Sequence, residues 1–405
     1  MISEFKIQDT LGFRLSFACW CILVIVFKEI DLVLYPRLWA EEGAIFYTFA
    51  LHHSVWEIMA TPHVGYFTLF NGMVSALQAK VFQPEAAAWV STVAGFIVQF
   101  IPLLIVLFGN HSFWDNPFKK VIVCCIIVFF MPPELWLNTT NSHFVFGLIT
   151  FLILITPTGS LSGLKRWGFR TLLVLGTLTD PISLFLTPLF VVKWHADRRK
   201  EDCVQAVIQL LCSTIQAGVI FYSLLYDNSY ARLQFPNWRV MVQGFFIDHF
   251  SLNLVMFNPD CKYGWLIVGI LMAAYFVYVC VMRRTSREHF YFLAGFIIIA
   301  LISTLGSLQM QGGPRYGYVP TCILMIILFA EACSLVCVRN YSRIIAMVIF
   351  TFALTVNGIY YKSRMMESCS PAYPKWKEEV AKWRTNRDYK PIIHPTGSYT
   401  WWVNL

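Results

Sequence analysis

Long apolar runs separated by short polar segments dominate this 405-residue chain. A helix needs about 20 apolar residues to cross the roughly 30 Å hydrocarbon core of a bilayer. About eleven runs approach that length, and we expect a helix in each: 13–35, 65–82, 86–108, 121–136, 143–157, 168–192, 204–226, 264–282, 290–308, 317–337 and 342–361. The pattern predicts an all-α polytopic membrane protein with a single integral domain over residues 1–405.

The composition supports the same class. Hydrophobic residues make up 57% of the chain and charged residues only 13%, whereas soluble domains carry roughly 25% charged residues. A soluble chain of this composition would lack the polar surface to cover its core. We therefore expect the excess apolar surface to face lipid.

The basic residues lie in short clusters between the apolar runs. The net charge is +8, and the tendency of cytoplasmic loops to carry Lys and Arg explains it without a nucleic-acid partner. We assign to the cytoplasm the clusters 193–200 and 283–287 together with Lys6, Arg14, Arg339 and Arg343. The N-terminus is then cytoplasmic, and the tail 362–405 lies outside.

The topology between residues 65 and 170 has two solutions. If 65–82 crosses the membrane, Lys119/Lys120 and Lys165/Arg166/Arg170 lie outside, against the charge rule. If 65–82 is re-entrant and 168–192 is a hairpin that turns at Asp180-Pro181, every basic cluster lies inside. The sequence leaves both open.

Four segments are too long or too polar to be simple connections: 36–64, 138–143, 227–263 and the tail 362–405. We expect 36–64, 227–263 and 362–405 to lie on the outer face. The first of them is expected to carry short helices next to the membrane.

The segment Pro36–Gly43 follows the first apolar run and contains the adjacent acids Glu41 and Glu42 beside Arg37 and Trp39. Charges at a membrane boundary are costly to hold and commonly functional. A carboxylate in a partly dehydrated cleft can act as a general base. Alternatively, the acids favour the dipole at the start of a helix. The motif alone supports both interpretations equally.

A second motif, Gly312-Gly313-Pro314-Arg315-Tyr316-Gly317-Tyr318, lies between two late runs. The glycines allow close backbone approach, and the Arg315 guanidinium suits bidentate contact with phosphate. An interfacial Arg/Tyr anchor is the alternative. We favour an anion site at Arg315 with Tyr316.

Two polar islands interrupt apolar sequence, at 138–143 and 178–181. Backbone groups at a helix break need polar partners in a membrane. His143 is more often a structural histidine than a catalyst, and Asp180 can simply cap a broken helix. We predict a functional role for Asn141, His143 and Asp180 only if they lie in one site with Glu41 and Glu42.

The tail carries Trp376, Trp383, Trp401 and Trp402 among basic residues. An amphipathic segment at the membrane interface is the favoured interpretation, and a platform for stacking sugar rings is the alternative. Cys261 and Cys369 are the candidates for a disulfide on the outer face.

Several catalytic classes are disfavoured by missing motifs. The chain has no GxxxxGK[ST], GxSxG or HExxH sequence, which argues against a nucleotide-driven pump and a serine or zinc hydrolase. No CxxC pair occurs, and His52, His53 and His63 lack ligand spacing to a third partner, so we predict no metal site.

The order of motifs along the chain resembles that of the GT-C glycosyltransferases. An acidic pair in the first outward loop is followed by Gly65-Tyr66, then by Pro314-Arg315-Tyr316, and then by a Trp-rich tail. Among the GT-C enzymes, the chain is most similar to the bacterial and phage-encoded O-antigen glucosyltransferases that convert serotype. The family's acidic signature often includes an Asp, whereas this chain has Glu at both positions, which leaves open which carboxylate is the base. The resemblance implies a GT-C-like bundle of about eleven transmembrane helices.

What the resemblance implies about chemistry is specific. An undecaprenyl-phosphate hexose, with glucose favoured, would donate its sugar at the periplasmic face of the bacterial inner membrane. Glu41 or Glu42 would deprotonate a hydroxyl of an O-antigen or other cell-envelope glycan, and transfer would invert the anomeric centre. Arg315 and Tyr316 would hold the departing phosphate. Candidates for substrate contact are His63, Tyr66, Asn141, His143 and Asp180.

The resemblance implies no cofactor, and it leaves a divalent cation open. A small flippase and a donor-synthesising transferase are the implied protein partners. A multi-pass transporter or flippase of a lipid-linked sugar is the alternative function, although no internal repeat supports it. A membrane O-acyltransferase would need a catalytic histidine near the start of the chain, and none is found.

Overall fold

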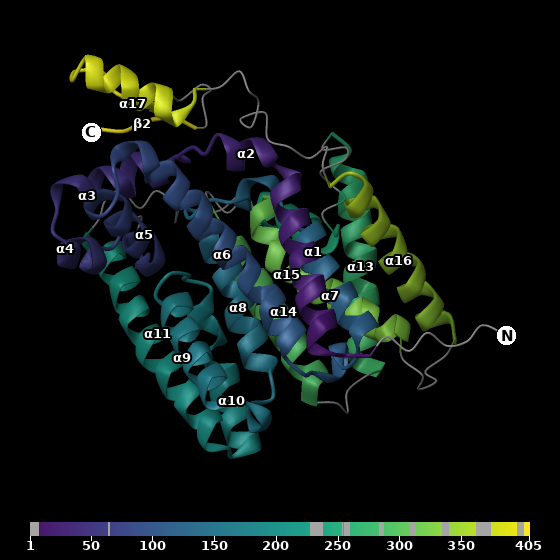
Figure 1. Ribbon diagram of the computed structural model, residues 1–405. Helices are drawn as coiled ribbons and strands as arrows, with labels where there is room; N and C mark the ends of the chain where they lie inside the picture. Colours follow the sequence, from purple (N-terminus) through teal and green to yellow (C-terminus); the bar gives the residue numbers. More distant parts are fainter. Residues whose placement is uncertain are drawn as a thin grey trace.

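The structure of the chain is a computed structural model that describes residues 8–63, 65–226, 238–252, 254, 260–282, 287–307, 313–333, 340–361, 374–394 and 401–405. Helices account for most of these residues (Figure 1). The one sheet in the described ranges is an antiparallel pair of short strands, β1 (Ile392–Ile393) and β2 (Trp401–Trp402).

Seven helices in the described part of the chain are long and apolar enough to cross a membrane. They are α1 (Leu11–Lys28), α6 (Ala87–Phe108), α11 (Lys200–Tyr226), α13 (Lys262–Met282), α14 (Arg287–Leu305), α15 (Pro314–Cys333) and α16 (Asn340–Ile359). The expectation of an all-α polytopic membrane protein is confirmed. The predicted number of about eleven spans stays a prediction.

Shorter helices complete the bundle. They are α5 (Leu69–Lys80), α7 (Pro117–Phe129), α8 (Ser142–Ile155), α9 (Gly163–Thr177) and α10 (Thr187–Asp197). Buried residues make up 13 of the 14 residues of α8 and 15 of the 20 residues of α15, as expected for helices at the centre of a bundle.

The structure distinguishes the two topologies that the sequence left open. Helix α5 has only 12 residues, or about 18 Å, which is too short to cross. It begins against the carboxyl end of α9, where the Leu69 amide donates to the Leu178 carbonyl at 3.0 Å. The predicted run 168–192 is two helices, α9 and α10, separated at Asp180-Pro181. The helix ends are therefore arranged in the bundle as the second alternative expects, and the re-entrant placement of 65–82 in a membrane stays a prediction.

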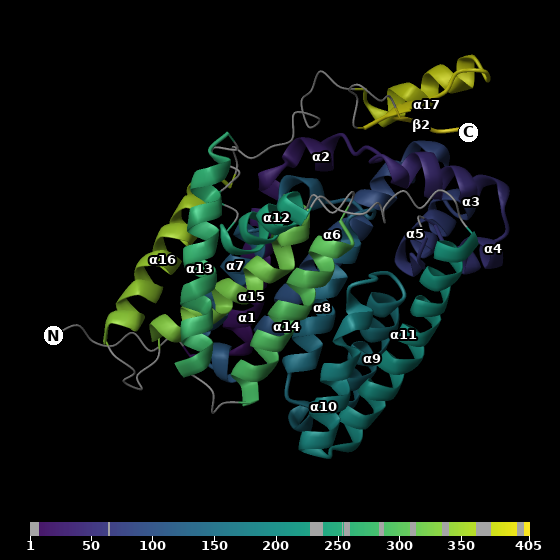
Figure 2. The same ribbon diagram turned by 180° about the vertical axis from the view of Figure 1, so that it is seen from behind.

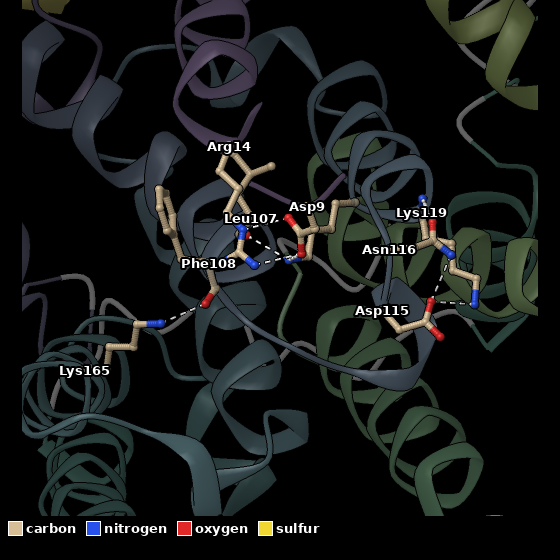
Figure 3. Close-up of polar contacts among 9 residues, drawn as sticks. Asp9, Arg14, Leu107, Phe108, Asp115, Asn116, Lys119 and Lys165 are labelled. Atoms are coloured by element: carbon tan, nitrogen blue, oxygen red, sulfur yellow. Dashed lines mark hydrogen bonds and ion pairs between the residues drawn. The ribbon is translucent and has the colours of Figure 1, made fainter. Parts of the chain in front are cut away.

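The basic clusters meet at one end of the bundle, which we call the basic end. Arg14 at the start of α1 and Lys120 at the start of α7 both form ion pairs with Asp9, each at 2.7 Å. Lys165 Nζ donates to the carbonyl of Phe108 at the end of α6, at 2.9 Å (Figure 3). Lys6, Arg339 and residues 283–286 lie outside the described residues.

Further contacts join α9, α10, α11 and α14 to the same end. Arg170 pairs with Glu201 at 2.6 Å, and Arg287 pairs with Asp197 at 3.5 Å. Every described basic cluster that the charge rule would place on one side of a membrane thus lies on one side of this bundle.

The opposite end carries short helices and the tail. These are α2 (Ile30–Leu34), the π-helix η1 (Glu42–Tyr47), α3 (Thr48–His52), α4 (Val55–Ala60), α12 (Trp238–Phe250) and α17 (Trp376–Thr385). Figures 1 and 2 show α2, α3, α4 and α17 at this end and α10 at the other. Single 3-10 turns are η2 (Pro84–Ala86), η3 (Ser112–Trp114), η4 (Pro133–Leu135), η5 (Thr158–Ser160) and η6 (Ser183–Leu186).

Candidate functional site

A cavity of about 470 Å³ opens among the helix ends on the side opposite the basic end. Such a volume suits a small-molecule or headgroup site. Its walls come from the first loop, α8, the α9–α10 break, α11, α14 and α15. The polar lining residues are Glu41, Tyr66, Thr68, Thr140, Asn141, His143, Ser303, Arg315 and Tyr316, and the apolar ones include Trp39, Phe46, Phe144, Ile182, Phe185, Ile220, Leu224, Ile302 and Leu305.

The two adjacent acids of the first loop lie in different environments. Glu41 lines the cavity and is half-buried. It follows Ala40, whose φ of 35° places the backbone in the left-handed region, which non-glycine residues seldom adopt. Glu42 starts η1 and is 2% exposed. The backbone turn at Ala40 therefore separates a cavity-facing carboxylate from a buried one.

Glu42 is held by donors from three elements. Its Oε1 accepts from Ser91 Oγ at 2.5 Å, from Thr139 Oγ1 at 2.7 Å and from the Thr139 amide, and its Oε2 accepts from the Trp39 amide at 2.8 Å. Burial raises the pKa of Glu42, and these donors oppose the rise. Glu42 ties the first loop to α6 and to the polar island before α8, which is a structural role.

Replacing Glu42 should therefore impair folding more than chemistry. In Glu42→Gln the new amide group would face at least one backbone donor, so we expect a loss of about 1–3 kcal/mol in the free energy of unfolding. Thermal unfolding in detergent measures this. Glu378→Gln, which changes a surface acid with a 65% exposed side chain, is the control and should unfold like the parent. Unchanged stability with lost activity would contradict the structural role.

Arg315 lies in the first turn of α15 and lines the cavity. Its Nη1 is 3.4 Å from Glu134 Oε2, and its guanidinium is 5.2 Å from the Tyr316 ring centroid. It also interacts electrostatically with Glu41. The loop before it is anchored, because the Gly313 amide donates to Asp248 Oδ2 at 2.7 Å. The Arg315 cation and the Glu41 carboxylate thus line one cavity.

The start of α8 contributes a second polar group to the lining. His143 Nδ1 lies 2.8 Å from the Thr140 carbonyl. A carbonyl only accepts, so Nδ1 carries the proton and Nε2 is an acceptor in the neutral ring. The His143 ring makes an edge contact with Tyr66 at 6.4 Å between centroids. Asn141 Nδ2 donates to the Glu134 carbonyl at 2.8 Å.

Two predicted substrate residues lie behind the wall rather than in it. His63 packs edge-on against Phe46 and Phe49, at centroid distances of 5.1 and 4.9 Å, and burial lowers its pKa. Asp180 is fully buried and accepts from the amides of Ile182 and Ser183, at 3.1 and 2.9 Å. It caps the helix break, while its neighbours Pro181 and Ile182 reach the cavity.

The sequence interpretation did not include Glu134, Trp39 or Phe46 in the site. Glu134 is the ion-pair partner of Arg315, and an acid between Pro133 and Leu135 in an apolar run was an available signal. Trp39 belongs to the acidic segment that the sequence singled out, although it had no assigned role, whereas the wall position of Phe46 has no comparable signal in the sequence. Among the described residues, no group of three or more His, Cys, Asp or Glu side chains is placed to hold a metal ion. Cys369, the predicted disulfide partner of Cys261, lies outside the described residues.

Comparison with known proteins finds similarity to solved structures alone. No family model matches the chain, and no curated protein matches it. The chain is similar to ArnT from Cupriavidus metallidurans, whose crystal structure was determined bound to undecaprenyl phosphate. The alignment covers 87% of this chain and 73% of ArnT, with 12% sequence identity and a TM-score of 0.40. A superposition this loose establishes neither a family nor an activity for this chain.

Proposed function

We propose that this protein is a membrane-embedded glycosyltransferase that moves a hexose, with glucose favoured, from a polyprenyl phosphate to a glycan acceptor. The observation that carries the proposal is the presence of Glu41 and Arg315 in the walls of one cavity among the helix ends. Transfer of a sugar from a phosphate uses a base that takes the proton of the acceptor hydroxyl and a cation that stabilises the leaving phosphate. Glu41 and Arg315 carry these two opposite charges.

The mechanism assigns one role to each group. The Glu41 carboxylate takes the proton of an acceptor hydroxyl, whose oxygen attacks the anomeric carbon from the face opposite the phosphate. The bond between the anomeric carbon and the phosphate oxygen breaks, and the electron pair stays on the lipid phosphate. Arg315, helped by Tyr316, stabilises the charge that develops there. The anomeric configuration is inverted, and these steps require no nucleotide.

The neighbouring residues support this assignment of roles. The ion pair with Glu134 restricts the Arg315 guanidinium, which lines the cavity. Tyr66 and His143 both line the cavity with aromatic rings, which suit the apolar face of a sugar. The apolar wall from α11 and α14 suits the lipid portion of the donor.

The same proposal sets the orientation. With the basic end in the cytoplasm, the cavity opens toward the periplasm of a bacterial inner membrane. The acceptor is then an O-antigen or another envelope glycan. A donor made on the cytoplasmic side would reach the cavity only after a small flippase and a donor-synthesising transferase had acted.

Expression in a strain with a defined O-antigen tests the proposal. We expect the mass of the polysaccharide repeat to increase by one hexose when the chain is produced together with a polyprenyl-phosphate hexose supply. The strain with the empty vector and the same supply is the control. An unchanged repeat mass, with the protein present in the membrane, would overturn the O-antigen acceptor.

A further inference from the structure

The tail is folded against the first loop rather than lying alone. Helix α17 and strand β2 are adjacent at the end of the molecule that carries α3 and α4 (Figures 1 and 2). Trp376 Nε1 donates to the Pro84 carbonyl at 2.7 Å. Arg384 holds Glu85 with two contacts, at 2.5 and 3.0 Å. The contacts of Trp376 and Arg384 anchor α17 to η2, the turn directly before α6.

A small apolar core lies between the tail and the loop, separate from the core of the bundle. It contains Leu38, Tyr47, Ala87, Ala88, Trp376, Val380, Ile393 and Val403. Gly43, in the acidic segment, is packed under this core. A Cβ atom at Gly43 would lie 2.6 Å from Ile393 Cδ1 and 2.9 Å from Val403 Cγ2. The tail therefore leaves no room for a side chain at this position of the segment.

The tail also hydrogen-bonds the backbone directly before Glu41. The amide of His394 donates to the Leu38 carbonyl at 3.3 Å, and the amide of Ala40 donates to the His394 carbonyl. Ala40 is the residue with φ of 35°. An alanine remains in that conformation only where its surroundings hold it. Here the two hydrogen bonds to His394 and the packing of Ile393 do so.

We propose that the tail, residues 374–394 and 401–405, is a clamp that positions the Glu41 carboxylate. By holding Ala40 in the left-handed conformation, the clamp directs Glu41 into the cavity and Glu42 into its buried set of donors. Ile393, His394 and Val403 are positioning residues, since none of them lines the cavity. The role of Glu41 as the base rests on the proposed function. The contacts between the tail and the backbone before Glu41 do not depend on it.

Substitutions within the full chain test the clamp. Ile393→Asp places a charge in the tail core, so we expect at least a tenfold loss of hexose-modified repeats at equal protein level. Ile393→Ala should give an intermediate loss, and Ile393→Val should keep parental activity. Ala381→Asp, the same kind of change at an exposed position of α17, is the matched control and should behave like the parent. Parental activity in Ile393→Asp would overturn the clamp.

A second measurement does not depend on activity. Glu41→Cys supplies a thiol at the cavity, and its labelling rate by a polar maleimide in detergent is compared with and without Ile393→Asp, after subtraction of the parent's own cysteines. We expect at least a tenfold faster rate in the double variant. An unchanged rate would overturn the clamp, whether or not the parent transfers a sugar. A faster rate in a chain whose parent never modifies any glycan would support the clamp and refute the transferase.

Discussion

Glu41→Gln is expected to lower hexose transfer by about 10²- to 10⁴-fold, because the amide cannot take the proton of the acceptor hydroxyl. The change removes one charge at a half-buried cavity wall and breaks none of the hydrogen bonds that hold Glu42. We therefore expect normal protein level and thermal stability. The fraction of polysaccharide repeats that gain a hexose, measured by mass spectrometry at matched protein level, gives the effect.

Glu42→Gln serves as the paired comparison for this experiment. It should lose stability while keeping substantial activity per folded molecule, which is the opposite pattern. If Glu41→Gln retained full activity and Glu42→Gln lost it without unfolding, the assignment of the base would be reversed. Full activity in both variants would refute a carboxylate base in this segment.

Arg315→Ala is expected to lower transfer by about 10²- to 10³-fold, since it removes the cation that stabilises the leaving phosphate. Arg315→Lys should recover only part of this loss. An ammonium is a single point charge and lacks the planar fork that contacts two phosphate oxygens. The same mass assay measures both variants, and inhibition by free polyprenyl phosphate should weaken in parallel.

The control for Arg315 is a cation outside the cavity. Arg287→Ala removes an arginine at the basic end whose side chain is 73% exposed, and exposed ion pairs contribute at most about 1 kcal/mol. We expect parental activity from it. An Arg315→Ala variant with parental transfer would remove Arg315 from the mechanism, and an equal loss in Arg287→Ala would point to a general effect on charge or insertion.

The helices were predictable because each apolar run is a local property of the chain. The run 86–108 corresponds to α6 at Ala87–Phe108, and 204–226 corresponds to α11 at Lys200–Tyr226. A helix satisfies its backbone within the segment, so lipid exposure and length predict it without knowledge of neighbours. The breaks were harder to assign. The run 65–82 yields only the 12 residues of α5, since residues 65–68 lie outside the helix and the Leu69 amide bonds to the Leu178 carbonyl.

The convergence of the polar residues was only partly predictable. Six of the candidates from the sequence lie in the walls of one cavity. They are Glu41, Tyr66, Asn141, His143, Arg315 and Tyr316. Their chemical roles remain predictions. His63 and Asp180 were candidates of the same apparent quality, yet both lie behind the wall. Polarity within apolar sequence indicates that a residue needs a partner but not whether that partner is protein or ligand.

The sequence by itself determined the class of the protein, the positions of most helices and the short set of polar residues in which the site had to be sought. The tertiary structure decided how the helices of residues 65–170 are arranged in the bundle, because the contacts of Lys120, Lys165 and Arg170 show which helix ends lie together. It also distinguished Glu41 from Glu42. Two adjacent carboxylates have the same local sequence, and their separation arises from the turn at Ala40, which hydrogen-bonds to a residue more than 350 positions away. No pattern along the chain encodes that contact.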